Sequence, residues 1–342
     1  MRFFYSDTNK KYDPETFYRK GTVITHPERA IRATILHDAL TAAGFSEGPV
    51  KDYGLAPVLA VHTKDYVDFL STFWAKRAEI NADSTEFIPT HFPRLHMHHK
   101  PTGLEGLLGY YSADTSTAIQ AGTWDAVYGA AQVALSAADE MLATGVAYAL
   151  CRPPGHHAYA DCSGGFCYLN NTAIAAHYIG AQKNGPVAIL DIDVHHGNGT
   201  QGIFYNRGDM LTVSIHADPS NYFPYYAGYA EETGEGAGKG ANVNMPLAHK
   251  TGDDAYLAAL EKALDRIRDF KPSALVVALG LDASEHDPIG VLKITTEGFN
   301  RIARKIAAAG YPTLLVQEGG YLTEQLPLNL VSFIRGFKAE TA

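Results

Sequence analysis

The chain has 342 residues, of which 46% are hydrophobic and 19% are charged, and its net charge is −9 at pH 7. This composition allows a large core and excludes a disordered chain, and the acidic balance without a Lys/Arg cluster argues against nucleic-acid binding. The first residues lack the pattern of a signal peptide, and no stretch of about 18 apolar residues occurs, so we expect a cytoplasmic protein without a membrane span.

The stretch at 80–123 is rich in Pro, Gly, His and Thr and shows little periodicity. A structureless segment this long inside a compact domain is unusual and is often functional. We interpret it as a loop-rich insertion in a single domain that covers 1–342, and we expect it to contribute to a homodimer. The HMHH stretch at 96–99 lies within it. No framing ligands accompany these histidines, so we expect a loop or an interface rather than a metal site.

From about residue 126 onward, apolar runs alternate with segments of helical periodicity. Near-continuous apolar runs are typical of strands buried on both faces of a parallel sheet. Strands are predicted at 146–151, 187–194, 210–217, 274–283 and 312–320. Helices are predicted at 126–144, 254–270 and 297–310, and Gly145 and Gly310 stand where two of them end. Strands that alternate with helices imply an α/β fold with a parallel sheet flanked by helices on both faces.

Reactive side chains follow four of these predicted strands. The candidates are His156 and His157 in RPPGHH, Asp191, Asp193 and His195 in DIDVHH, Asp282, and Glu318 and Tyr321 in EGGY. In open α/β sheets, ligands bind beyond the carboxyl ends of the strands. The coincidence across four strands therefore predicts one functional site.

Asp191, Asp193 and His195 stand at alternate positions and should share one face of their strand. Two carboxylates and an imidazole side by side repel or desolvate one another unless a cation joins them. We interpret Asp193, His195 and Asp282 as ligands of a divalent cation, with Asp191 orienting a neighbouring imidazole. Oxygen and nitrogen ligands suit Zn²⁺, Fe²⁺, Mn²⁺ or Co²⁺. The alternative is a structural Asp/His network or an ordered-water site.

His156 and His157 follow a rigid Pro-Gly segment and can supply a base and an acid or electrostatic partner. Tyr321 follows two glycines and can donate a hydrogen bond to a polarised oxygen. Incidental surface histidines and an ordinary turn tyrosine are the alternatives, because the chain has 15 histidines and 20 tyrosines.

At these residues the sequence resembles the zinc-dependent deacetylase family, which spans histone deacetylases and bacterial acetylpolyamine amidohydrolases. The matching stretches include RPPGHHA, GGFCYLNNTAIAA, ILDIDVHHGNGTQGIFY, VSIHADP, GEGAGKGANVNMPL, LGLDASEHDP and QEGGY. The chain layout most resembles the amidohydrolase branch. The resemblance implies an arginase-like fold and a metal-dependent amide hydrolase that removes acetyl groups from small cationic substrates such as acetylputrescine or acetylcadaverine. A protein acetyl-lysine deacetylase with the same site is the alternative.

The resemblance also implies catalytic roles, with Zn²⁺ on the three ligands named above. It suggests His157 as the general base and acid, oriented by Asn198. His156, held by Asp191, is implied as an electrostatic partner, and Tyr321 as the group that binds the scissile carbonyl oxygen.

Further sets of residues follow from the same resemblance. Phe166 and Phe223 look like tunnel walls. Glu105 in the insertion is the candidate that attracts a distal ammonium group, and a solvated loop glutamate is the alternative. The substrate-binding residues implied are Glu105, Gly165, Phe166, Phe223 and Ile289. The residues implied for a structural K⁺ are Asp191, Asp193, His195, Ser214 and Ile215. A second acidic position of the branch falls on Ser116, with Asp114 close by.

Two further alternatives remain at this point. A binuclear ureohydrolase-like enzyme on a related fold needs more bridging Asp and His ligands. A small-molecule sensor that has lost the chemistry is disfavoured by the complete set of His156, His157 and Tyr321.

Overall fold

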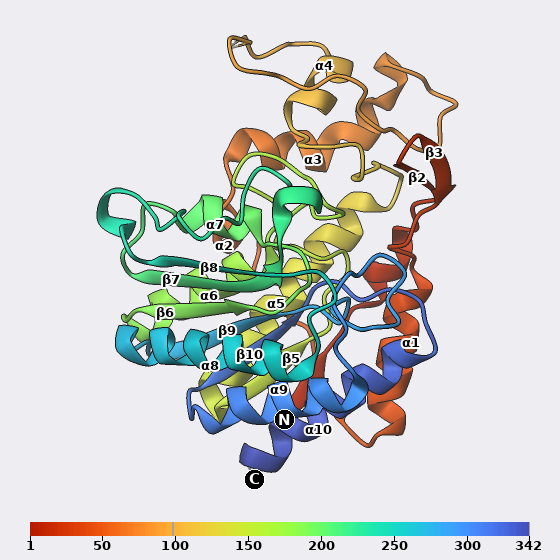
Figure 1. Ribbon diagram of the computed structural model, residues 1–342. Helices are drawn as coiled ribbons and strands as arrows, with labels where there is room; N and C mark the ends of the chain where they lie inside the picture. Colours follow the sequence, from red (N-terminus) through yellow and green to blue (C-terminus); the bar gives the residue numbers. More distant parts are fainter. Residues whose placement is uncertain (98, 342) are drawn as a thin grey trace.

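The computed structural model describes residues 1–97 and 99–341. Its central feature is an eight-stranded sheet in which all neighbouring strands are parallel, in the order β4-β1-β5-β10-β9-β6-β7-β8 (Figure 1). The strands are β1 (Arg2–Phe4), β4 (Ser46–Gly48), β5 (Val146–Ala149), β6 (Val187–Asp191), β7 (Met210–Ala217), β8 (Asn242–Leu247), β9 (Ala274–Leu279) and β10 (Thr313–Gln317). A separate antiparallel hairpin consists of β2 (Thr16–Arg19) and β3 (Thr22–Thr25).

Helices cover both faces of this sheet (Figure 1). Side chains of α3, α5 and α6 belong to the apolar cluster on one face, and those of α1, α8, α9 and α10 belong to the cluster on the other. The helices are α1 (Ile31–Ala42), α2 (Ala56–Leu59), α3 (Lys64–Lys76), α4 (Leu104–Tyr110), α5 (Thr123–Thr144), α6 (Asn171–Lys183), α7 (Asn198–Phe204), α8 (Asp253–Phe270), α9 (Thr296–Ala308) and α10 (Gln325–Thr341). Short 3₁₀ turns are η1 (Asp7–Lys11), η2 (Arg77–Glu79), η3 (Pro219–Asn221) and η4 (Gly236–Gly238). The predicted α/β class is confirmed.

The apolar runs form strands because both faces of the sheet are buried. In β6, Val187 and Ile189 belong to one apolar cluster, whereas Ala188 and Leu190 belong to the other. A strand covered on both sides has no polar face, which explains its near-continuous hydrophobicity. The five predicted strands are confirmed as β5, β6, β7, β9 and β10, and the predicted helices as α5, α8 and α9.

The polar ends of the predicted strands lie outside the sheet. The strand predicted over 187–194 ends at Asp191, because beyond Ile192, whose N–H still donates to Ala278 of β9, the backbone N–H groups turn to carboxylates. Asp193 N–H donates to Asp191 Oδ1 at 3.1 Å, and Val194 N–H donates to Asp282 Oδ1 at 3.0 Å. Side chains nevertheless keep alternating, since Ile192 and Val194 remain in the core. Asp193 and His195 are therefore placed just beyond the end of β6.

Two glycines end helices as predicted. Gly145 has φ +90° directly after α5, and Gly310 has φ +76° shortly after α9. Only glycine adopts this backbone region without a steric penalty, so each allows a sharp return to the next strand.

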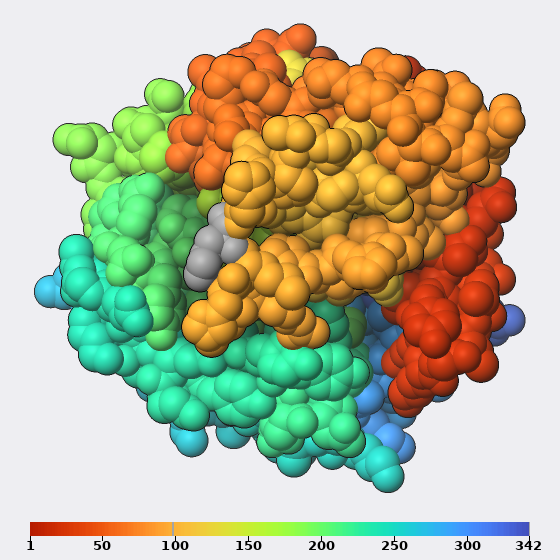
Figure 2. Space-filling model, turned by 90° about the horizontal axis from the view of Figure 1, so that it is seen from above, coloured from red at the N-terminus to blue at the C-terminus, as the bar shows by residue number. Residues whose placement is uncertain are grey.

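The insertion at 80–123 contains the short helix α4 and is otherwise mostly irregular, with isolated bridges between Phe87 and Ile119 and between Ser112 and Ser163. Seen from above in Figure 2, it appears in orange, bordered by the red N-terminal segment and the teal segment near residue 225. His98 of the HMHH stretch lies outside the described residues. Among the described helices, none is both long and apolar enough to cross a membrane.

Candidate active site

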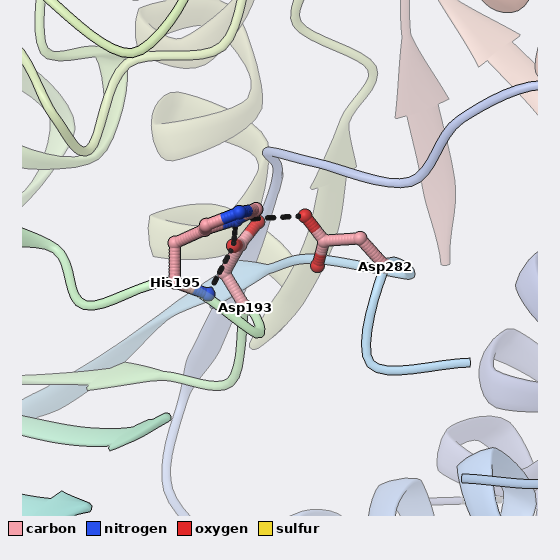
Figure 3. A group of neighbouring side chains, drawn as sticks. All are labelled: Asp193, His195 and Asp282. Atoms are coloured by element: carbon pink, nitrogen blue, oxygen red, sulfur yellow. Dashed lines mark hydrogen bonds and ion pairs between the residues drawn. The ribbon is translucent and has the colours of Figure 1, made fainter. Parts of the chain in front are cut away.

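Three buried side chains from two strand ends form one group (Figure 3). Asp193 and His195 follow β6, and Asp282 follows β9, the neighbouring strand. One potential ligand atom of each lies within 4.8 Å of the others. His195 Nδ1 lies 3.1 Å from Asp193 Oδ1 and 3.3 Å from Asp282 Oδ2. Within residues 1–97 and 99–341 this is the single group of three or more potential metal ligands.

An incomplete set of hydrogen bonds makes this group suitable for a cation. Asp282 Oδ2 is buried and accepts no hydrogen bond from the described residues, although the oxygen lies 3.3 Å from His195 Nδ1. Gly319 packs against both carboxylates, since a Cβ there would lie 2.1 Å from Asp282 Oδ2 and 2.5 Å from Asp193 Oδ2. A bound cation would satisfy the buried carboxylate oxygen of Asp282. The geometry therefore fits a divalent cation better than the structural network.

The electrostatics of the three ligands lead to the same conclusion. Burial and the charge of Asp193 raise the pKa of Asp282. Burial also opposes ionisation of Asp193, but the neighbouring imidazoles, His156 first, lower its pKa overall. Although burial disfavours the charged imidazole, the two carboxylates raise the pKa of His195 to about 9. A divalent cation would compensate the two buried carboxylates directly.

Two adjacent histidines lie beside this group and have different hydrogen-bond partners. His156 Nδ1 lies 2.8 Å from Asp191 Oδ2, and His157 Nδ1 lies 2.6 Å from Asn198 Oδ1. The ring centroids of His156 and His157 are 3.9 Å apart. Because an amide oxygen only accepts, Nδ1 of His157 carries the proton and its Nε2 is left as an acceptor.

These surroundings shift the two imidazoles in opposite directions. Burial, followed by the charges of His156 and His195, lowers the pKa of His157. Burial also disfavours the charged form of His156, but Asp191 and Asp193 raise its pKa overall. The surroundings therefore favour the neutral form of His157 and the cationic form of His156, which separates a proton acceptor from an electrostatic partner.

Tyr321 is held from two sides after β10. Its N–H donates to Asp287 Oδ2 at 2.8 Å. The guanidinium of Arg32 donates to the carbonyl oxygens of Glu318 and Gly320 and lies 5.4 Å from the Tyr321 ring centroid. Gly320 has φ +112°, which lets the chain turn sharply before the tyrosine. The side chain of Tyr321 is thereby placed at the wall of a cavity.

That cavity has a volume of about 460 Å³ and adjoins the whole group. The predicted substrate-binding residues on its wall are Gly165, Phe166, Phe223 and Ile289. The Phe223 ring lies edge-on to His157 at 4.9 Å, and the Phe166 ring lies edge-on to Tyr321 at 5.7 Å. Aromatic walls beside a polar end are suited to an extended apolar chain with a polar head.

Glu105 does not line this cavity within its own chain. It is exposed on α4 and lines a second cavity of about 490 Å³ inside the insertion. Neighbours in that second cavity include His91, Met97, His99 and Tyr110. Asp114 and Ser116 do line the first cavity, where Asp114 Oδ2 accepts the Gly165 N–H at 2.9 Å. The acidic side chain on the wall of the first cavity is thus Asp114.

The rim of the first cavity includes a segment for which the sequence reasoning predicted no role. The β2–β3 hairpin contributes Arg19 and Lys20, and neither forms an ion pair with any described residue. The alternating pattern TFYRKGTVIT with a central Lys-Gly is a hairpin signal that could have identified it.

A buried charge network was also missed. Glu28 Oε1 lies 3.2 Å from Arg32 Nη1 and 2.8 Å from Arg152 Nε, and all three side chains are buried. Arg152 begins the RPPGHH segment, and Arg32 contacts the loop of Tyr321. Buried charges require partners, so the triad holds these two loops in a defined relation. Arg152 is far from Glu28 and Arg32 in the sequence, and no local sequence pattern predicts their contact.

The residues implied for potassium lie at the end of β6, just beyond it, and within the neighbouring strand β7. Asp191 and Ser214 are register partners in β6 and β7, and Ile215 follows in β7. Ser214 Oγ lies 2.8 Å from His216 Nδ1.

Comparison with known proteins identifies the family. The histone deacetylase domain family matches residues 26–337. The chain belongs to the histone deacetylase family.

Several relatives of this deacetylase-family protein match over most of their length. It is 48% identical to acetylpolyamine amidohydrolase 1 of Pseudomonas aeruginosa over 292 residues, 84% of each chain. It is 42% identical to acetylpolyamine amidohydrolase of Mycoplana ramosa, over 98% of this chain and 99% of the relative. The crystal structure of acetylpolyamine aminohydrolase from Burkholderia pseudomallei superposes with a TM-score of 0.95, at 40% identity and 99% coverage of both chains. The predicted family and fold are confirmed.

Proposed function

We propose that this protein hydrolyses the acetamide group of N-acetylated polyamines and releases acetate and a free amine. The observation that carries the proposal is the convergence of the Asp193–His195–Asp282 group, a neutral His157 and Tyr321 on one cavity with aromatic walls. The names of relatives at 48% and 42% identity support the substrate class.

In this proposal His157 moves the proton. Its Nε2 accepts a proton from the attacking water, because Nδ1 is occupied by the hydrogen bond to Asn198. The same nitrogen then returns the proton to the departing amine. Asn198 and Asp191 act by orienting His157 and His156.

The developing negative charge on the carbonyl oxygen needs donors that are already in place. We assign the hydroxyl of Tyr321 and the cationic His156 to this role, because both are held by neighbours before substrate binds. Preorganised donors of this kind are effective in a site shielded from water.

Asp193, His195 and Asp282 would hold the metal ion, for which we propose Zn²⁺, with Fe²⁺, Mn²⁺ or Co²⁺ as substitutes. When bound, the ion would polarise the acetyl carbonyl and make water more acidic. Oxygen and nitrogen donors without a thiolate suit these ions, and the buried Asp282 Oδ2 without a hydrogen-bond partner supports this assignment. We also propose a structural K⁺ at the backbone near Asp191 and Ser214.

The substrate would place its alkyl chain between Phe166 and Phe223, with Gly165 and Ile289 completing the wall. An apolar passage of this kind excludes water from the acetamide and accepts a methylene chain.

We propose a homodimer formed through the insertion. Leu95 and Met97 are 83% and 62% exposed in the insertion, near the cavity lined by Glu105. Exposed apolar side chains of this size are typical of interaction surfaces. In a dimer, Glu105 would act at a subunit contact rather than at the cavity of its own chain. Sedimentation of Leu95→Asp/Met97→Asp as a monomer would support this arrangement, and an unchanged sedimentation coefficient would contradict it.

Steady-state kinetics test the function. We expect acetylputrescine and acetylcadaverine to have higher kcat/KM than acetyl-lysine peptides. A wide preference for peptides would instead assign a protein deacetylase with the same site. Lack of turnover on every acetamide would favour a sensor, and two metal ions per chain by elemental analysis would favour a binuclear enzyme.

A further inference from the structure

Glu318 is a fully buried carboxylate to which the proposed reaction assigns no task. It directly follows β10, three residues before Tyr321. Its Oε2 accepts the N–H of Gly155 at 2.6 Å and the N–H of His156 at 3.0 Å. Its Oε1 accepts the hydroxyl of Thr172 in α6 at 2.6 Å. One side chain thus joins three segments that are distant in sequence.

The segment that Glu318 holds is the irregular turn before His157. An irregular, buried turn has no strand or helix partner for its N–H groups, so those groups need another acceptor. An ionised carboxylate is the strongest acceptor available among side chains. Burial raises the pKa of Glu318 to about 6, against the opposing charge of His156.

We propose that Glu318 is a positioning residue that fixes the backbone of Gly155 and His156 relative to the loop of Tyr321. The inference rests on the function proposed above. Glu318 does not line the cavity, so it acts through the two histidines and not on the substrate.

The position of the carboxylate matters for a geometric reason. His157 must hold its Nε2 at the reacting atoms while Tyr321 meets the carbonyl oxygen from another strand end. Glu318 and Tyr321 follow the same strand, β10, so the two hydrogen bonds from Glu318 to the turn set the distance between the two loops. A displacement of about 1 Å in such an arrangement lowers the rate by roughly 100-fold.

Two variants separate position from charge. Glu318→Gln keeps the length and an acceptor oxygen for the two N–H groups, and its amide can donate to the Thr172 hydroxyl. Glu318→Asp keeps the charge but is one methylene shorter, so it cannot reach both the turn and α6. Thr172→Val removes one hydrogen bond without touching the turn and is the matched control.

The measurements are kcat and KM for acetylputrescine, metal content and melting temperature, each with the full chain. We expect Glu318→Asp to lower kcat by about 100-fold, with KM within a few-fold and the metal content of the wild type. We expect Glu318→Gln to stay within about 10-fold of the wild-type kcat, and Thr172→Val to stay closer still. A general loss of stability would not spare kcat in Glu318→Gln while lowering it in Glu318→Asp.

Three results would overturn the inference: wild-type kcat in Glu318→Asp, equal losses in the Asp and Gln variants, or loss of metal together with kcat. If the Asp variant does not fold, the Gln variant decides alone, because a loss above about 100-fold there contradicts a positional role. A wild-type protein inactive on all acetamides would refute the proposed function instead, and the variants would then show no pattern in kcat to interpret.

Discussion

His157 Nδ1 lies 2.6 Å from the side-chain oxygen of Asn198, which begins α7. This contact fixes the tautomer of the imidazole and directs the unprotonated Nε2 toward the cavity side of the ring. The side-chain amide of Asn198 therefore orients the proton acceptor, His157, without contacting the substrate.

Loss of that contact should slow the chemical step. Asn198→Leu removes the acceptor, so His157 samples the wrong tautomer and kcat should fall by about 10- to 100-fold, with little change in KM. Asn198→Asp retains an acceptor oxygen and should lose less than the Leu variant. Equal kcat in wild type and Asn198→Leu would show that the contact is irrelevant to turnover.

Tyr321→Phe tests the assigned oxyanion donor. Removal of one preorganised donor lowers kcat by about 100- to 1000-fold, and KM should change only modestly. The phenyl ring keeps the contacts with Phe166 and Arg32, so the melting temperature should be close to that of the wild type. An unchanged kcat would reject the role of the hydroxyl.

Asp282→Asn tests the proposed cation site. The variant should lose activity, and elemental analysis should find less than one metal ion per chain after supply of Zn²⁺. Chelation should lower the melting temperature of the wild type, because a ligand of the native state stabilises it, but not that of the variant. Asp254→Asn changes an exposed carboxylate that pairs with Arg301 at 2.8 Å and is the control. Full metal content in Asp282→Asn would remove this residue from the ligand set.

Arg19 on the β2–β3 hairpin should change kcat/KM according to the charge that a substrate carries at the end opposite its acetamide group. It lines the cavity and lacks an ion-pair partner among the described residues, so it disfavours a terminal ammonium group. Arg19→Gln should raise kcat/KM for acetylputrescine by about 5-fold, as expected for about 1 kcal/mol of repulsion at a partly solvated site. The uncharged analogue N-butylacetamide should be unaffected, as should the control variant Arg301→Gln. A parallel change for both substrates would indicate a steric effect instead.

Buried histidines predict lower stability in acid. Burial lowers the pKa of His62 to about 4 and that of His216 to about 4. In the unfolded chain the value is about 6.5, so the unfolded state binds these protons more readily. The free energy of unfolding should have its full value above pH 6.5 and should fall as the pH drops to 4, by up to about 3 kcal/mol for each histidine.

Denaturant unfolding between pH 4 and pH 7 checks this prediction. His62→Gln keeps an acceptor for the Asn170 N–H, which lies 2.9 Å from His62 Nε2, and removes the titration. Its stability should depend less steeply on pH than that of the wild type, and the exposed control His286→Gln should not differ. If the free energy of unfolding depended equally steeply on pH in all three proteins, the contribution assigned to His62 would be wrong.

The sequence by itself determined the α/β class and the five strands of the second half, and it predicted the residues of the proposed site. The reason is local: apolar runs record burial on both sheet faces, and reactive groups mark where each run stops. DIDVHH even predicts the shared face of Asp193 and His195, because alternation persists beyond the end of β6.

Only the tertiary structure decided which segments meet. The three hydrogen bonds of Glu318 and the Glu28 network join residues far apart in the chain. The same holds for Glu105, which lines a different cavity, and for Arg19, which lines the cavity beside His157. Such contacts arise from the packing of whole elements against one another, and local spacing contains no record of that packing.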